Sequence, residues 1–170
     1  MYFRGFPYSV HAKVMHALHN PIPPAGTNLP RENGPMKLQL LSDLHLESHP
    51  HFEATPAPGA DLLVLAGDIG CYQAGSRLDG TLFGLERFSP RHGWPVPVLY
   101  VPGNHEYDND DFDAVHQRLR EVCERLDIRW PESETAVIDG VRFVGSSLWT
   151  DFDALVDPRE PMTEQLKKRG

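Results

Sequence analysis

The sequence predicts an α/β protein with a layered fold and a mixed β-sheet. Three short apolar runs, at residues 38–41, 62–66 and 95–101, have the length and composition of buried strands. A helical pattern at residues 110–126 follows the third run, and a β-hairpin pattern follows the helix. Strands that alternate with helical segments along a chain are typical of the α/β class.

The second and third strand patterns indicate a parallel arrangement. Residues 62–66 read Leu-Leu-Val-Leu-Ala, a continuous apolar run typical of a strand that is covered on both faces. The third run has Pro95 and Pro97 at its start, where a missing backbone N–H costs least. Residues 71–93 separate the two strands, with a short helix expected at residues 81–88. A connection of this length suits a parallel crossover.

The clearest helix is predicted at residues 110–126. Apolar side chains recur there at helical spacing and form one stripe: Phe112, Val115, Leu119, Val122 and Leu126. Asp110, Asp111 and Asp113 crowd the first turn, where the helix dipole favours negative charge.

A hairpin is predicted after this helix. Two β-prone runs, at residues 135–138 and 141–144, flank Asp139-Gly140, and this dipeptide is a strong signal for a tight two-residue turn. Residues 128–130 are expected to form a brief strand before the hairpin.

The first 35 residues differ in kind from the rest. They contain six prolines and three glycines, and such spacing favours an extended or disordered segment. Only residues 12–19 are expected to form a helical turn or two, and no apolar core of a secretory signal is present. We therefore predict an irregular or disordered extension at residues 1–35 and a single domain at residues 36–170.

The bulk composition excludes several classes of protein. At 170 residues, the chain is long enough for one domain with an ordinary core. Its formal net charge of −8 disfavours nucleic acid as a partner, because phosphate backbones attract Lys and Arg. No apolar run approaches the roughly 18 residues of a membrane helix, so no membrane partner is expected. Cys71 and Cys123 are too few for a disulfide framework, so a reduced, cytoplasmic setting is expected. Cys71 is expected to be an ordinary loop residue.

Each of the three predicted strands is followed by polar residues that can bind a cation. Asp43 and His45 follow the first strand, Asp68 follows the second, and Asn104 and His105 follow the third. Sites in α/β sheets lie beyond the carboxyl ends of the strands. Carboxylate oxygen and imidazole nitrogen are ligands of hard and borderline divalent cations. The three motifs in this order therefore predict a cation site.

The spacing within each motif suggests how it would be used. Asp43 and His45 are two residues apart, so on an extended segment both side chains point to one side and can reach one ion. The two oxygens of Asp68 can bridge two cations. Asn104 offers a neutral carbonyl oxygen, and the adjacent His105 points elsewhere, where it can act as a general acid or bind phosphate.

These motifs resemble the first three blocks of the calcineurin-like metallophosphoesterases. The likeness is carried by residues 42–47, 66–70 and 102–106, and it extends over about residues 37–152. Residues 145–152 also resemble a stretch found in some bacterial members. The resemblance implies a layered α/β/β/α sandwich, in which two sheets pack face to face.

The resemblance also implies a site. Asp43 and His45 would hold the first metal ion, Asp68 would bridge both ions, and Asn104 would hold the second. The implied cofactors are two divalent metal ions, and Mn²⁺, Fe²⁺ or Fe³⁺, Zn²⁺ and Ni²⁺ all accept such ligands. The implied reaction is hydrolysis of phosphate mono- or diesters by a metal-bound hydroxide, with His105 as the catalytic residue that protonates the leaving-group oxygen.

The family completes its site with later histidines that bind both metals. After His105, the only histidine in this chain is His116, which is expected on the flank of the predicted helix. We expect no other residue to replace these ligands, and we expect the fold to be incomplete at the C-terminus. The alternative to an active phosphoesterase is therefore a catalytically incompetent, truncated fragment that retains only partial metal binding.

A third class, a binding module for protein or nucleic acid, is disfavoured by the net charge and by the lack of basic clusters. A nuclease within the same family stays open. The sequence also leaves open the substrate, which could be a nucleotide, a protein phosphate, a phosphodiester or a lipid. The identity of the metal and the oligomeric state are equally open.

Overall fold

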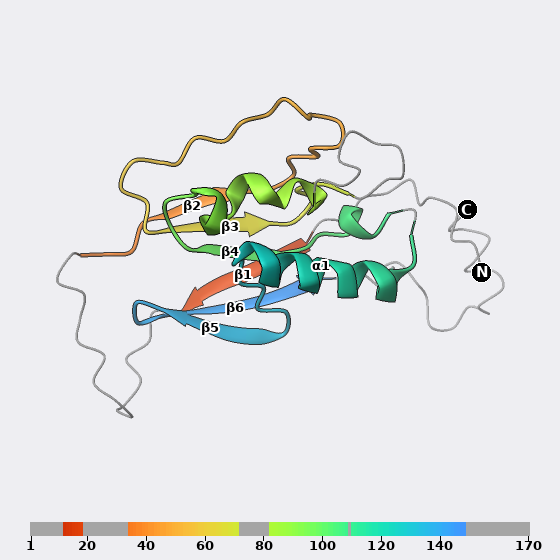
Figure 1. The fold of residues 1–170 in the computed structure, drawn as a ribbon. Helices are drawn as coiled ribbons and strands as arrows, with labels where there is room; N and C mark the ends of the chain where they lie inside the picture. Colours follow the sequence, from red (N-terminus) through yellow and green to blue (C-terminus); the bar gives the residue numbers. More distant parts are fainter. Residues whose placement is uncertain (1–11, 19–33, 72–81, 109, 149–170) are drawn as a thin grey trace, which may run out of the picture.

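The computed structural model describes residues 12–18, 34–71, 82–108 and 110–148, and the structural statements below concern these residues. Within them, the strands form two three-stranded sheets, one parallel and one antiparallel (Figure 1). The predicted α/β class is confirmed, with its parallel and antiparallel pairings divided between the two sheets.

The parallel sheet has the order β2-β3-β4. Its strands are β2 (Leu38–Leu41), β3 (Leu62–Ala66) and β4 (Val98–Val101). Leu40 pairs with Val64, which in turn pairs with Leu99. The strand β4 begins three residues later than its apolar run, because Pro95 and Pro97 lack the N–H that a ladder requires. Since all three strands run in the same direction, their carboxyl ends lie at one edge.

The antiparallel sheet has the order β1-β6-β5. Its strands are β1 (Ala12–Leu18), β5 (Glu134–Ile138) and β6 (Val141–Leu148). The predicted hairpin is confirmed: Asp139 and Gly140 both have left-handed backbone, with φ of 47° and 77°, as the tightest hairpin turn requires.

The strand β1 corrects one expectation. Residues 12–18 form a strand that pairs with β6 along its whole length, where a helical turn or two was expected. The pairing joins segments more than 120 residues apart, which a local pattern cannot reveal. The predicted domain boundary at residue 36 stays a prediction.

The strand β3 is covered on both faces, as its continuous apolar sequence predicts. Leu63 and Leu65 pack into the core that includes the helices. Leu62 and Val64 pack between the two sheets, against Phe143 of β6 among others. The described residues therefore form three layers, one helical and two of sheet, which agrees with the α/β/β part of the predicted sandwich.

The helical layer is built mainly by α1 (Phe112–Leu126) and by a kinked 3₁₀ segment, η1 (Leu82–Phe88). Asp111 is the N-cap of α1, and its side chain accepts a hydrogen bond from the backbone N–H of Ala114 at 3.0 Å. The helix buries most of its predicted stripe: Val115, Leu119, Val122 and Leu126. No helix in the described part of the chain is both long enough and apolar enough to cross a membrane.

Candidate functional site

The three predicted motifs meet at the carboxyl edge of the parallel sheet. Strand pairing continues past the ends of β2 and β3, because backbone N–H groups of the first loop donate to carbonyl oxygens of the second. These bonds join Asp43 to Gly67 at 3.0 Å, His45 to Asp68 at 3.0 Å and Leu46 to Ile69 at 2.9 Å. The loop after β4 is attached as well, since the N–H of His105 donates to Asp68 Oδ1 at 3.2 Å.

Three of the predicted ligands have left-handed backbone. Asp43, His45 and Asp68 have φ of 55°, 45° and 51°, in a region that residues with a side chain seldom adopt. The expectation that Asp43 and His45 share one side of an extended segment is therefore wrong. Tight left-handed turns bring these side chains together instead. Backbone strain of this kind tends to be found at functional sites.

The side chains of Asp43, His45 and Asp68 form a candidate metal group. Each offers one ligand atom, and these atoms all lie within 4.8 Å of one another. Two carboxylates and one imidazole suit a hard or borderline divalent cation. Asp68 has no exposed surface, and a cation beside it would offset the cost of burying its charge. These residues therefore fit a metal ion.

Asn104 begins the short 3₁₀ turn η3 (His105–Tyr107), and its side chain makes no capping hydrogen bond there. A capping role, the ordinary explanation for an asparagine at such a turn, is thus not what this side chain performs. Asn104 is half-buried and directly precedes His105, whose backbone N–H donates to Asp68.

His105 lies beside the candidate metal group. Its ring is 4.7 Å from the ring of His45, centroid to centroid. Its Nε2 is 2.9 Å from Glu47 Oε1, and its Nδ1 is 2.6 Å from Asp108 Oδ2. A hydrogen bond with the Cys71 side chain, followed by the influence of Glu47 and Asp108, raises the pKa of His105 to about 10 against the opposing effect of burial. These neighbours favour the protonated form of the ring.

Glu47 is part of the first motif, but no role was predicted for it from the sequence. Its side chain is only 6% exposed and stands between His45 and His105. Burial opposes its ionisation, but hydrogen bonds from backbone N–H groups and from His105 hold the pKa of Glu47 below its ordinary value. Cys71, expected to be an ordinary loop residue, donates one of those bonds.

Glu106 is the second residue whose role the sequence analysis missed. It is 1% exposed, and its carboxylate accepts hydrogen bonds from the backbone N–H groups of Asp68 (3.0 Å), Ile69 (2.7 Å) and Gly103 (2.8 Å). Burial, and then the charge of Asp68, raise the pKa of Glu106 to about 7. The sequence around Glu106 has no pattern that shows whether its charge is buried or exposed.

His116 takes the structural place expected for it. Its Nδ1 lies 3.2 Å from the hydroxyl of Tyr107, and its ring is 4.7 Å from that of Trp130, centroid to centroid. It packs on the flank of α1.

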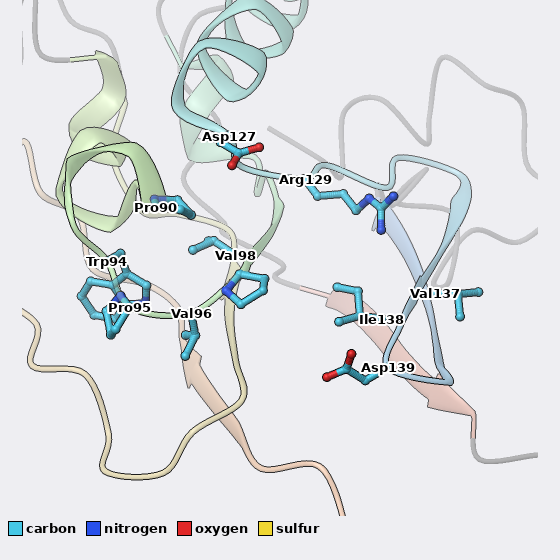
Figure 2. Close-up of a pocket in the computed structure, with 11 residues that line it drawn as sticks. Pro90, Trp94, Pro95, Val96, Val98, Asp127, Arg129, Val137, Ile138 and Asp139 are labelled. Carbon is cyan, nitrogen blue, oxygen red and sulfur yellow. The ribbon is translucent and has the colours of Figure 1, made fainter. Parts of the chain in front are cut away.

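A cavity of about 620 Å³ lies away from this site (Figure 2). Trp94, Val98, Arg129 and Ile138 are among the residues that line it. Val98 is the first residue of β4, whereas the third motif follows the last residue of that strand. The cavity is therefore at the opposite end of the parallel sheet from the candidate metal group.

The fold and the donor set together define an α/β protein with a candidate metal-ligand group. The family model of the calcineurin-like phosphoesterases matches residues 36–165, and the chain belongs to this family.

One curated relative is an uncharacterized protein, L509, of Acanthamoeba polyphaga mimivirus. The two chains are 30% identical over 136 residues, which cover 68% of this chain and 45% of the viral protein. The chain thus spans less than half the length of this relative. No solved structure matches the chain at a significant level.

Proposed function

We propose that the protein hydrolyses phosphate monoesters or diesters with two divalent cations held at the carboxyl edge of the parallel sheet. The observation that carries this proposal is the convergence of Asp43, His45 and Asp68, whose ligand atoms lie within 4.8 Å of one another. Membership of the calcineurin-like phosphoesterase family supports the same reaction.

The proposed ligands divide between the two cations. Asp43 and His45 would hold one cation, Asn104 would hold the other, and Asp68 would serve both. When bound, such cations supply Lewis acidity toward the phosphoryl oxygens and lower the pKa of an attacking water. The chain's own contribution is to hold the donors in a fixed arrangement through the backbone bonds between the first two loops.

His105 supplies the acid in this proposal. Its ring lies 4.7 Å from that of His45, and its raised pKa favours the protonated form. In that form it can attract the phosphate anion and protonate the departing oxygen. Transfer of a proton by a positioned side chain contributes typically about 10²–10⁴ in rate. The site therefore combines charge stabilisation at phosphorus with protonation of the leaving group.

The test is hydrolysis of p-nitrophenyl phosphate and bis-p-nitrophenyl phosphate by purified protein with added Mn²⁺. We expect metal-dependent activity that Asp68→Asn abolishes. Asp127→Asn is the matched control, because Asp127 is the left-handed C-cap of α1 and asparagine tolerates that conformation. A folded sample that binds Mn²⁺ but hydrolyses neither ester would overturn the proposal in favour of a fragment with partial metal binding.

A further inference from the structure

Glu47 connects the three loops that form the site. It belongs to the loop after β2. Its Oε2 accepts a hydrogen bond from the N–H of Cys71, in the loop after β3, at 3.1 Å. Its Oε1 lies 2.9 Å from Nε2 of His105, in the loop after β4. Glu47 therefore cannot easily move away from His105, because the loop after β3 holds its other oxygen and its side chain is almost fully buried.

We propose that Glu47 is a positioning residue, which holds the His105 ring through Nε2 so that Nδ1 is the nitrogen that faces the leaving group. This inference rests on the proposed function of the site, because it identifies which nitrogen of His105 delivers the proton. Glu47 itself contacts no reacting atom in this arrangement.

The two carboxylates on the His105 ring differ in how freely they can move. Glu47 is 6% exposed, whereas Asp108 is 46% exposed. Displacing Glu47 would break its bond to Cys71 and leave a buried charge without its partners, which is costly. Asp108 can turn toward water at little cost, as exposed ion pairs contribute little. A substrate oxygen that approaches His105 therefore replaces Asp108 at Nδ1.

The same geometry offers a second role for Glu47, as a metal ligand, because His45, Glu47 and His105 also have ligand atoms within 4.8 Å of one another. The hydrogen bonds favour positioning. Both oxygens of Glu47 are already engaged by donors from two other loops, whereas Asp43 and Asp68 bring two carboxylates to the other group. We therefore propose positioning, and the Mn²⁺ affinity measured below distinguishes it from metal ligation by Glu47.

Dependence on the leaving group separates positioning from a purely structural role. p-Nitrophenolate departs without protonation, whereas an alkoxide needs an acid. In Glu47→Gln, we expect kcat/KM for an alkyl phosphodiester to fall about 10-fold more than for bis-p-nitrophenyl phosphate, a part of the roughly 10²–10⁴ that a positioned acid contributes. Glu121→Gln, an exposed residue of α1, is the matched control and should change neither rate.

Two kinetic results would overturn the proposal. An equal fall for both esters in Glu47→Gln means that Glu47 only supports the fold. The fall in kcat/KM for the alkyl ester, relative to the nitrophenyl ester, can also be larger in Asp108→Asn than in Glu47→Gln. That result means that Asp108 positions the ring. Because Asp108 is exposed, this second variant folds even if Glu47→Gln does not.

Two further measurements do not require the protein to be catalytically active. In the ¹⁵N spectrum of the His105 ring, Glu47→Gln should shift the Nε2 resonance, and Glu121→Gln should not; an unchanged Nε2 resonance contradicts the proposal. Mn²⁺ affinity measured by calorimetry should stay within about 3-fold of wild type. A loss as large as that of Asp68→Asn would identify Glu47 as a ligand instead. If wild type hydrolyses no ester, the proposed function fails, and these measurements still decide the role of Glu47.

Discussion

The carboxylate of Glu106 accepts a hydrogen bond from the backbone N–H of Asp68 at 3.0 Å, in a fully buried setting. Asp68 is the central predicted ligand, and its backbone is left-handed. Glu106 also binds the N–H groups of Ile69 and Gly103, so one side chain fixes the loops after β3 and β4 relative to each other. The candidate metal group therefore depends on a residue that is not one of its ligands.

Glu106→Gln should destabilise the protein. The amide that replaces one carboxylate oxygen is a donor, so it faces backbone N–H groups that need an acceptor. We expect the free energy of unfolding to fall by roughly 1.5–3 kcal/mol, the usual range for hydrogen bonds to a charged group. Urea denaturation of the metal-free protein measures this change. Glu124→Gln, an exposed position on α1, is the control, and an equal loss in both variants would contradict the role of Glu106.

Asp68→Asn should weaken metal binding without lowering the stability of the metal-free protein. After burial, the charge of Asp68 is a cause of the raised pKa of Glu106, as expected for two neighbouring buried carboxylates. Removing that charge should leave the metal-free variant at least as stable as wild type. The amide oxygen of the variant can still accept the hydrogen bond from the N–H of His105.

Mn²⁺ should then stabilise the wild type and not Asp68→Asn. A ligand at 100 times its Kd stabilises the native state by about 2.7 kcal/mol, so Mn²⁺ should raise the melting temperature of wild type and not that of Asp68→Asn. Differential scanning calorimetry with and without Mn²⁺ makes the comparison. Equal Mn²⁺ effects on both proteins would mean that the cation binds elsewhere.

Those parts of the structure that local sequence determines could be predicted. The strand β3 is a continuous apolar run, α1 has a regular stripe, and Asp139-Gly140 forms the turn between β5 and β6. The candidate ligands were predictable because parallel strands bring their carboxyl ends to one edge. Each of these inferences needs only neighbouring residues and one rule of α/β architecture.

The parts that depend on distant contacts could not be predicted. The strand β1 exists through its pairing with β6, far along the chain. Glu47 and Glu106 are buried because three loops meet around them, and neither residue has a local pattern that shows this. The left-handed backbone of Asp43 and His45 likewise follows from hydrogen bonds to the loop after β3.

Cys123 should be unreactive in the native protein. Burial raises the pKa of its thiol to about 12, and the thiolate is the reactive form. Because the folded state holds the proton more tightly than the unfolded state, ionisation of Cys123 lowers stability only as pH rises above about 9. We expect iodoacetamide at pH 8 to leave Cys123 unmodified in native protein and to modify it in urea. Peptide mapping by mass spectrometry measures both, and rapid native labelling would contradict its burial in α1.

Gly145→Ala should weaken the contact between the two sheets. Gly145 lies in the middle of β6, and a Cβ there would meet the backbone oxygen of Pro131 at 2.7 Å and Val101 Cγ2 at 3.1 Å. A backbone oxygen cannot move aside as a flexible side chain can, so β6 must shift away from Pro131 and from Val101 at the end of β4. Two residues further on, the hydroxyl of Ser147 donates to the carbonyl oxygen of Pro102 at 3.1 Å, and Pro102 is the first residue of the third motif.

The expected loss in the free energy of unfolding is about 1–3 kcal/mol, the usual cost of overpacking. Ser146→Ala is the matched control, because it ends in the same residue at the adjacent position of β6 and adds no atoms. Since the displaced strand also supports the loop that carries Asn104 and His105, Gly145→Ala should lower Mn²⁺ affinity while Ser146→Ala does not. Urea denaturation and calorimetric titration of Mn²⁺ check the two effects separately. Unchanged stability in Gly145→Ala would mean that β6 does not approach Pro131 as closely as this structure shows.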